Sequence, residues 1–180
     1  MERIAFGHAA SVAPRAYASR VSPTLRSRAR AAAAGAAAAM VWGLLEPLDA
    51  RLFRSDYRDI ALLGKLVTSG RGWKVAGYAL HGVNGALFGL GVESVRRRSG
   101  LPARPLALGL ALAENVALYP LALLVDRKHP RRGEPHLPPL WSRRVFAQET
   151  FRHAVFGLVL GSLVEKAPLG DGRTRASRRR

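Results

Sequence analysis

No cysteine occurs in this 180-residue chain, and acidic residues are scarce, with 12 Asp and Glu against 29 Lys and Arg. Without cysteine there is no disulfide framework, no thiolate nucleophile and no Cys-ligated zinc or iron–sulfur site. The sequence also lacks a Walker motif, a dinucleotide-binding fingerprint, G-x-S-x-G and H-E-x-x-H. The sequence therefore contains none of these motifs of soluble enzymes. We expect a protein that is not an enzyme, and we predict no cofactor and no metal.

The apolar residues are not spread evenly. They gather into four blocks separated by arginine-rich segments, although the mean hydropathy of the whole chain is 0.00. Each block reaches the lower limit of about 17 residues that a helix needs to cross a bilayer. The sequence therefore predicts an all-α fold, an integral membrane four-helix bundle over residues 31–165. The predicted spans are 31–48, 75–95, 105–125 and 145–164.

Basic segments flank this predicted membrane domain on both sides. Residues 1–30 and 166–180 are rich in arginine, and the formal net charge of the chain is +17. In a soluble protein this charge would suggest nucleic-acid binding. Beside membrane spans, it favours contact with anionic lipid headgroups instead. We therefore predict two loosely ordered cytoplasmic tails that contact the lipid bilayer, and we predict no nucleic-acid partner. The alternative for residues 1–30 is a transit peptide.

Loop charge indicates the orientation of the spans. The short loop between the second and third spans holds Arg96, Arg97, Arg98 and Arg104, and short basic loops stay on the cytoplasmic side. With the tails, this side carries 16 Lys and Arg, against 12 on the other side. The bias predicts a multi-pass protein of the cell (inner) membrane with both termini in the cytoplasm.

Two connecting segments have features of their own. Ser55 can cap a helix, and apolar residues recur at helical spacing up to Val67, which predicts a short interfacial helix after the first span. Residues 126–144 contain several prolines and predict an extended outer loop. Pro120 is expected to kink the third span.

One pattern occurs twice, as H-x3-G-x3-G-x3-E at 81–93 and again at 153–165. The two segments align at an offset of 72 without gaps. Small residues four apart let helices approach closely. We therefore predict a duplicated two-helix unit with GxxxG packing, in which convergence of two packing motifs is the alternative. The expected packing glycines are Gly77, Gly85, Gly89, Gly157 and Gly161.

Every predicted span contributes a polar residue at membrane depth. Ionisable groups there are costly unless they are paired or hydrated, so these side chains should face the bundle interior. Glu149 and Arg152 lie three residues apart on one face, which suits an ion pair. The predicted buried polar cluster comprises Glu46, His81, Asn84, Glu114, Asn115, Glu149, Arg152 and His153.

Two acidic residues lie at the inner ends of the second and fourth spans. Glu93 is followed by Arg96–Arg98, and Glu165 is followed by Lys166. We expect both carboxylates to form interfacial ion pairs.

Three functions fit these predictions. The first is a structural or interaction subunit, either a homo-oligomer or a protein with a separate membrane partner, in which the polar cluster holds helices together. The second is ion- or proton-linked transport through a hydrated cavity, since histidine titrates near neutrality. The third is a redox protein that binds haem or a metal through its histidines.

The segment Arg152-His-Ala-Val-Phe-Gly-Leu-Val-Leu-Gly161, with the matching residues of the second span, resembles uncharacterised small four-span bacterial inner-membrane proteins. The resemblance covers about residues 31–165. It implies a location and a number of spans, and no catalytic residue.

Overall fold

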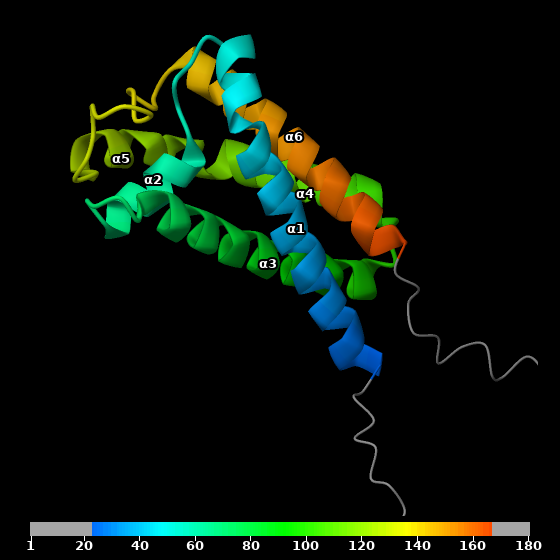
Figure 1. Ribbon diagram of the computed structural model, residues 1–180. Coiled ribbons are helices and arrows are strands. Elements are labelled where there is room, and N and C mark those ends of the chain that lie inside the picture. Colours follow the sequence, from blue (N-terminus) through cyan, green and yellow to red (C-terminus); the bar gives the residue numbers. More distant parts are fainter. Residues whose placement is uncertain (1–22, 167–180) are drawn as a thin grey trace, which may run out of the picture.

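The computed structural model describes residues 23–166, and every regular element in that range is helical (Figure 1). The predictions for residues 1–22 and 167–180 lie outside the described residues. In chain order the elements are α1 (Pro23–Leu52), α2 (Asp59–Val67), α3 (Trp73–Ser99), α4 (Ala103–Leu118), the 3-10 helix η1 (Tyr119–Leu121), α5 (Ala122–Lys128) and α6 (Arg143–Glu165).

Three helical segments are long and apolar enough to cross a membrane: Thr24–Leu52, Trp73–Ser99 and Ala103–Lys128. The prediction of a helical membrane protein is confirmed at that level. Within residues 23–166, α6 is not among these candidate spans. Its first half carries Gln148, Glu149, Arg152 and His153, which lower its hydropathy.

The first helix begins at Pro23, eight residues before the predicted start of the span. Proline suits the first turn of a helix, and the alanine run Ala31–Ala39 strongly favours helix. Pro47 lies inside α1 and lacks an N–H, so the carbonyl of Gly43 has no helical donor. The Tyr78 hydroxyl donates a hydrogen bond to that carbonyl at 3.3 Å. This contact from α3 supports α1 where proline weakens it.

Two close helix pairs make up the bundle. α1 packs along α3, and α4 packs along α6, while α1 also contacts α6. A Cβ atom at Gly85 would lie 2.6 Å from the Cβ of Ala39 on α1. A Cβ atom at Gly161 would lie 2.6 Å from the Cα of Arg104 on α4. In each pair, glycines of the second helix therefore allow the backbones to touch.

The short helix expected after the first span is present as α2, and it is tightly docked on α3. Asp59, Ile60 and Lys65 of α2 are buried. A Cβ atom at Gly64 would collide with the carbonyl of Trp73, and one at Gly77 would collide with the carbonyl of Ile60. Glycine on both helices thus brings α2 against the side of the bundle.

The segment between α5 and α6 covers one end of the bundle and is tied to α2. Lys65 donates to the Pro135 carbonyl at 2.8 Å, and His129 Nε2 donates to the Leu62 carbonyl at 3.0 Å. Pro120 lies in η1, where the third apolar segment changes from α-helix to 3-10 geometry. The α-helix is therefore interrupted at the proline where a kink was expected.

The opposite end of the bundle is basic. It gathers the start of α1, the α3–α4 loop and the end of α6 (Figure 1). Glu93 is 1% exposed, pairs with Arg96 at 2.9 Å and accepts a hydrogen bond from Ser27. Glu165 pairs with Arg104 at 2.8 Å, rather than with Lys166 beside it. These contacts join α1 to α3 and α4 to α6.

Candidate functional site

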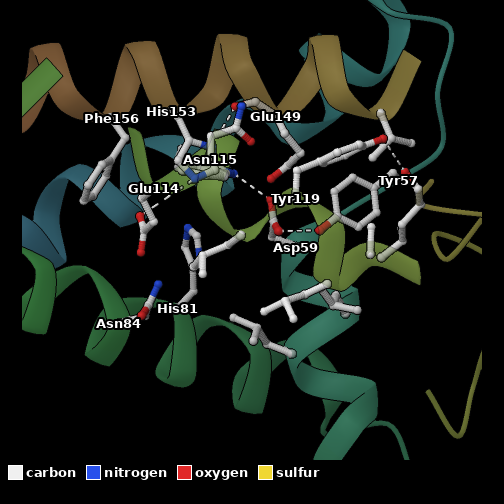
Figure 2. A pocket seen from close by; sticks show the side chains of 18 of the residues that line it. Tyr57, Asp59, His81, Asn84, Glu114, Asn115, Tyr119, Glu149, His153 and Phe156 are labelled. Atoms are coloured by element: carbon white, nitrogen blue, oxygen red, sulfur yellow. Dashed lines mark hydrogen bonds and ion pairs between the residues drawn. The ribbon is translucent and has the colours of Figure 1, made fainter. Parts of the chain in front are cut away.

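A cavity of about 280 Å³ lies inside the bundle, where α3 and α4 diverge (Figure 2). All the long helices and α2 contribute to its wall. Its polar lining consists of Tyr57, Asp59, His81, Asn84, Glu114, Asn115, Tyr119, Glu149 and His153, together with the indole of Trp42. Close packing is the rule in protein interiors, so a cavity of this size lined by ionisable groups requires an explanation.

Behind the cavity, Arg152 is 2% exposed and is surrounded by carboxylates. Its guanidinium makes a bidentate pair with Asp49, through Nε and Nη2, at 2.6 Å each. Its Nη1 donates to Asp59 at 3.0 Å and to Glu149 at 3.1 Å. A fourth carboxylate, that of Glu46, lies 3.9 Å from Nη1. Planar guanidinium suits such multidentate contacts, and this one joins α1, α2 and α6.

Asp59 connects this network to the cavity. It accepts hydrogen bonds from the Tyr57 hydroxyl at 2.5 Å and the Trp42 indole at 3.0 Å, in addition to Arg152. Burial alone would raise the pKa of Asp59, but the guanidinium reverses that effect and holds the pKa below its usual value. Burial, together with the Asp59 charge, raises the pKa of the Tyr57 hydroxyl well above its usual value. Tyr57 therefore remains a hydrogen-bond donor.

The two histidines of the repeated pattern face the cavity in different ways. His153 Nδ1 donates to the Glu149 carbonyl at 2.8 Å, so in the neutral ring Nε2 is the free acceptor. That Nε2 lies 3.9 Å from a carboxylate oxygen of Glu114. His81 is 6% exposed, and its Nε2 has no hydrogen-bond partner among the described residues. The indole of Trp42 packs edge-on against both imidazoles, with centroids 5.2 Å and 4.7 Å away.

No family model, curated protein or solved structure matches this chain. The candidate site therefore rests on its own geometry alone.

The structure brings most of the predicted polar cluster together. His81, Asn84, Glu114, Asn115, Glu149 and His153 line the cavity. Arg152 lies behind the wall, and Glu46 accepts from the backbone N–H of Ile60 at 3.0 Å beside it. Asn115 donates to the Thr150 hydroxyl at 2.9 Å and so links α4 to α6. Asn84 is exposed at the edge of the cavity.

Five residues of the site were missed from the sequence: Trp42, Asp49, Tyr57, Asp59 and Gln148. Three of them lie in or beside the first inter-span segment, which was expected to meet solvent or the membrane surface. Gln148 is fully buried and donates to Asp49 at 2.5 Å. The sequence feature that could have indicated them is the pair Gly64 and Gly77. Glycines on two neighbouring helices allow the short helix to pack against the bundle instead of lying on the membrane surface.

The arrangement does not offer a ready metal centre. Among residues 23–166 no group of three or more His, Asp or Glu side chains is placed to hold a metal ion. A bis-histidine haem would need both imidazoles to reach one iron, and the indole of Trp42 packs edge-on against both of them.

Proposed function

We propose that this chain is a four-span membrane protein whose internal cavity binds a cation in exchange with protons. The observation that carries the proposal is the charge balance around Arg152. One guanidinium faces four carboxylates, and all five groups are buried. Excess negative charge is very costly in a low-dielectric interior, so protons or a further cation must compensate it.

The fourth span in this proposal is α6. Its polar residues Gln148, Glu149 and Arg152 are buried inside the bundle. Between residues 147 and 163 the exposed residues of α6 are Ala147, Phe151, Leu158 and Leu163, all of them apolar. A helix that hides its charges within the protein can face lipid with its remaining surface. Both termini would then lie on the basic side of the membrane, as the positive-inside rule favours.

Duplication of a two-helix unit is consistent with the packing. Gly85 and Gly89 meet α1, and the equivalent Gly157 and Gly161 meet α4. The halves differ at one informative position, where Gly77 corresponds to Glu149. Because Gly77 has no side chain, α2 approaches α3 there, and α2 brings Asp59 to Arg152.

Proton exchange would involve the groups that face the cavity. Imidazole is the side chain whose reference pKa, about 6.5, is closest to neutrality, so His81 and His153 are the natural groups to hold or release a proton here. Around them lie the carboxylates of Asp59, Glu114 and Glu149, with Arg152 behind. Glu114 and His153 are a pair with few competing partners, and at 3.9 Å a small side-chain rotation brings them to hydrogen-bond distance for proton transfer.

Reconstitution into liposomes tests the proposal. With an imposed pH gradient and an internal pH-sensitive dye, the full chain should dissipate the gradient faster than empty liposomes. Glu114→Gln should slow this by at least about tenfold, because a positioned proton-transfer group typically contributes about 10²–10⁴-fold. Glu165→Gln, which removes an exposed carboxylate outside the cavity, is the matched control. Equal rates for the wild-type chain and empty liposomes would contradict the proposal.

A structural or interaction subunit is the second candidate, and the Arg152 network favours it. The contacts of Arg152 tie α1, α2 and α6 together through four carboxylate oxygens. Such a network stabilises a bundle whether or not anything moves through it. A partner or second copy that co-purifies stoichiometrically from native membranes, with no proton movement in liposomes, would favour this candidate.

A further inference from the structure

We infer, building on the proposed cation-linked function, that the cavity takes a small organic ammonium ion with an apolar body, which enters from the bilayer between α3 and α4. Three independent features of the cavity carry this inference: the chemistry of its lining, its unsatisfied polar atoms and the position of its mouth.

The lining combines negative charge with aromatic surface. Three carboxylates, those of Asp59, Glu114 and Glu149, line the cavity, and no Lys or Arg does. The remaining wall is largely apolar and includes the rings of Trp42, Phe88, Tyr119 and Phe156. Carboxylates with aromatic faces are the groups that recognise ammonium ions attached to hydrocarbon. An anion would meet three carboxylates and no Lys or Arg here.

Of the three carboxylates, that of Glu114 is available to pair with a ligand. Asp59 and Glu149 already pair with Arg152. The Glu114 side chain is 30% exposed, and within residues 23–166 its one ion-pair partner at 4 Å or less is the His153 imidazole, at 3.9 Å. Figure 2 shows Glu114 and His81 directed into the same part of the cavity, with Asn84 beside them.

The second feature is the unpartnered Nε2 of His81. The residue is 6% exposed, lines the cavity and has no partner for this atom among residues 23–166. A buried polar atom without a hydrogen bond is costly unless water or a ligand supplies the missing partner. In the tautomer with the proton on Nδ1, Nε2 accepts from a donor such as an ammonium N–H.

The third feature is the position of the mouth. The exposed residues of the lining are Asn84 on α3, Leu118 on α4 and Leu121 on η1. They lie on the two segments that diverge from each other, at the depth of the apolar helices. The wall on the α2 side is closed by Leu140 and Val145, which are buried. A solute that enters between α3 and α4 comes from lipid, so it needs an apolar body.

The volume limits the size of the ligand. About 280 Å³ lies near the lower end of the range for small-molecule pockets, roughly 300–1,000 Å³. The cavity therefore suits one compact monoamine rather than a long chain.

Binding to the detergent-solubilised full chain tests the chemistry. Trp42 lines the cavity, so its fluorescence reports binding once Trp73→Phe and Trp141→Phe remove the other two indoles. The probes are benzylammonium, benzyl alcohol and benzoate, which share a body and differ in charge. Benzylammonium should bind saturably, and the other two should bind at least about tenfold more weakly, a difference of about 1.4 kcal/mol. Equal binding of benzyl alcohol or benzoate would overturn the inference.

Variants test the residues and the route. Glu114→Gln should weaken benzylammonium binding about tenfold, whereas Glu165→Gln should leave it unchanged. Leu118→Phe, at the mouth, should slow association without adding an indole, whereas Leu124→Phe, similarly exposed but outside the lining, should not. Unchanged affinity in Glu114→Gln would overturn the residue assignment. Unchanged association in Leu118→Phe would overturn the route.

The two proposals fail separately. Benzylammonium binding without proton movement in liposomes would leave the ligand class standing and refute the exchange. Proton movement without benzylammonium binding would leave the exchange standing and refute the ligand class.

Discussion

At the scale of single residues, the same type of contact has very different consequences in two places. Arg152 and its carboxylate partners are buried, whereas Arg104 and Glu165 are 54% and 44% exposed. Exposed pairs are solvated in both states and contribute little. Removing one member of a buried pair leaves the other as an uncompensated charge. The stability of the bundle should therefore depend on Arg152 far more than on Arg104.

Arg152→Met is expected to destabilise the protein by about 3–5 kcal/mol, because four carboxylates lose their guanidinium. Arg104→Gln should cost about 0–1 kcal/mol. Unfolding in mixed detergent micelles, followed by circular dichroism, measures both variants. The double variant Asp49→Asn with Arg152→Met should recover part of the loss. A loss for Arg152→Met no larger than that for Arg104→Gln would refute the importance of the network.

Outside the apolar helices, Asp56 and His136 form a pair that can be titrated. The backbone N–H and Nδ1 of His136 each lie 2.9 Å from an Asp56 carboxylate oxygen. Slight burial would raise the pKa of Asp56, but the hydrogen bonds from His136 outweigh it and lower the pKa below 3.8. A lowered folded-state pKa means that the contact stabilises the fold above the unfolded pKa. That stabilisation is lost as pH falls through the folded value.

His136→Ala should therefore move the pKa of Asp56 upward, part of the way to its ordinary value, since the backbone donor remains. Titration of the carboxyl carbon by NMR measures the shift. Arg132→Ala, an exposed change in the same segment, is the control. A downward shift in His136→Ala would show that the histidine does not lower the pKa.

At the scale of helices, glycine positions decide which surfaces meet. Gly85 and Gly91 lie on the same helix, α3, yet only Gly85 faces α1. A Cβ atom at Gly85 would lie 2.5 Å from the carbonyl oxygen of Gly35, whereas one at Gly91 would have nothing within 4 Å. The backbone contact at Gly85 has no flexible side chain that could move aside.

Gly85→Ala should therefore destabilise the bundle by about 1–3 kcal/mol through overpacking. Gly91→Ala should be neutral or slightly stabilising, because alanine favours helix over glycine. Both variants can be compared in the same unfolding assay. A Gly85→Ala protein as stable as the wild type would mean that α1 and α3 are less closely packed than described.

The sequence predicted the helices better than it predicted their environment. Apolar length and Pro120 were enough to locate the long helices, because both act locally. The position of α2 was not predictable in the same way, since charge and short length are equally typical of a surface helix. Asp59 becomes a central residue only because Gly64 and Gly77 allow α2 to dock, and Arg152 lies 93 residues further along the chain.

At the scale of the whole molecule, the proposed crossing of the membrane by α6 would place a charged interior and an apolar exterior together in the bilayer. The exposed side chains of α6 between residues 147 and 163 are apolar, and its buried face carries Arg152. If α6 lay outside the bilayer, the cavity wall formed by Glu149 and His153 would be removed from the other helices that share it. Topology is therefore the property on which the proposed cavity depends.

Because the chain has no cysteine, single substitutions report topology without a background. Gly70→Cys lies between α2 and α3, Arg132→Cys lies between α5 and α6, and Ser99→Cys lies at the last residue of α3, beside the α3–α4 loop. In intact cells a membrane-impermeant maleimide should label the first two and not the third, and a C-terminal tag should be inaccessible to antibody. If α6 does not cross, the tag and Arg132→Cys must lie on one side, whereas a crossing α6 separates them. His153 on α6 and Glu114 on α4 face each other. A cavity that both helices line within the membrane therefore requires the C-terminal tag and the cysteine of Arg132→Cys to lie on opposite sides of the membrane.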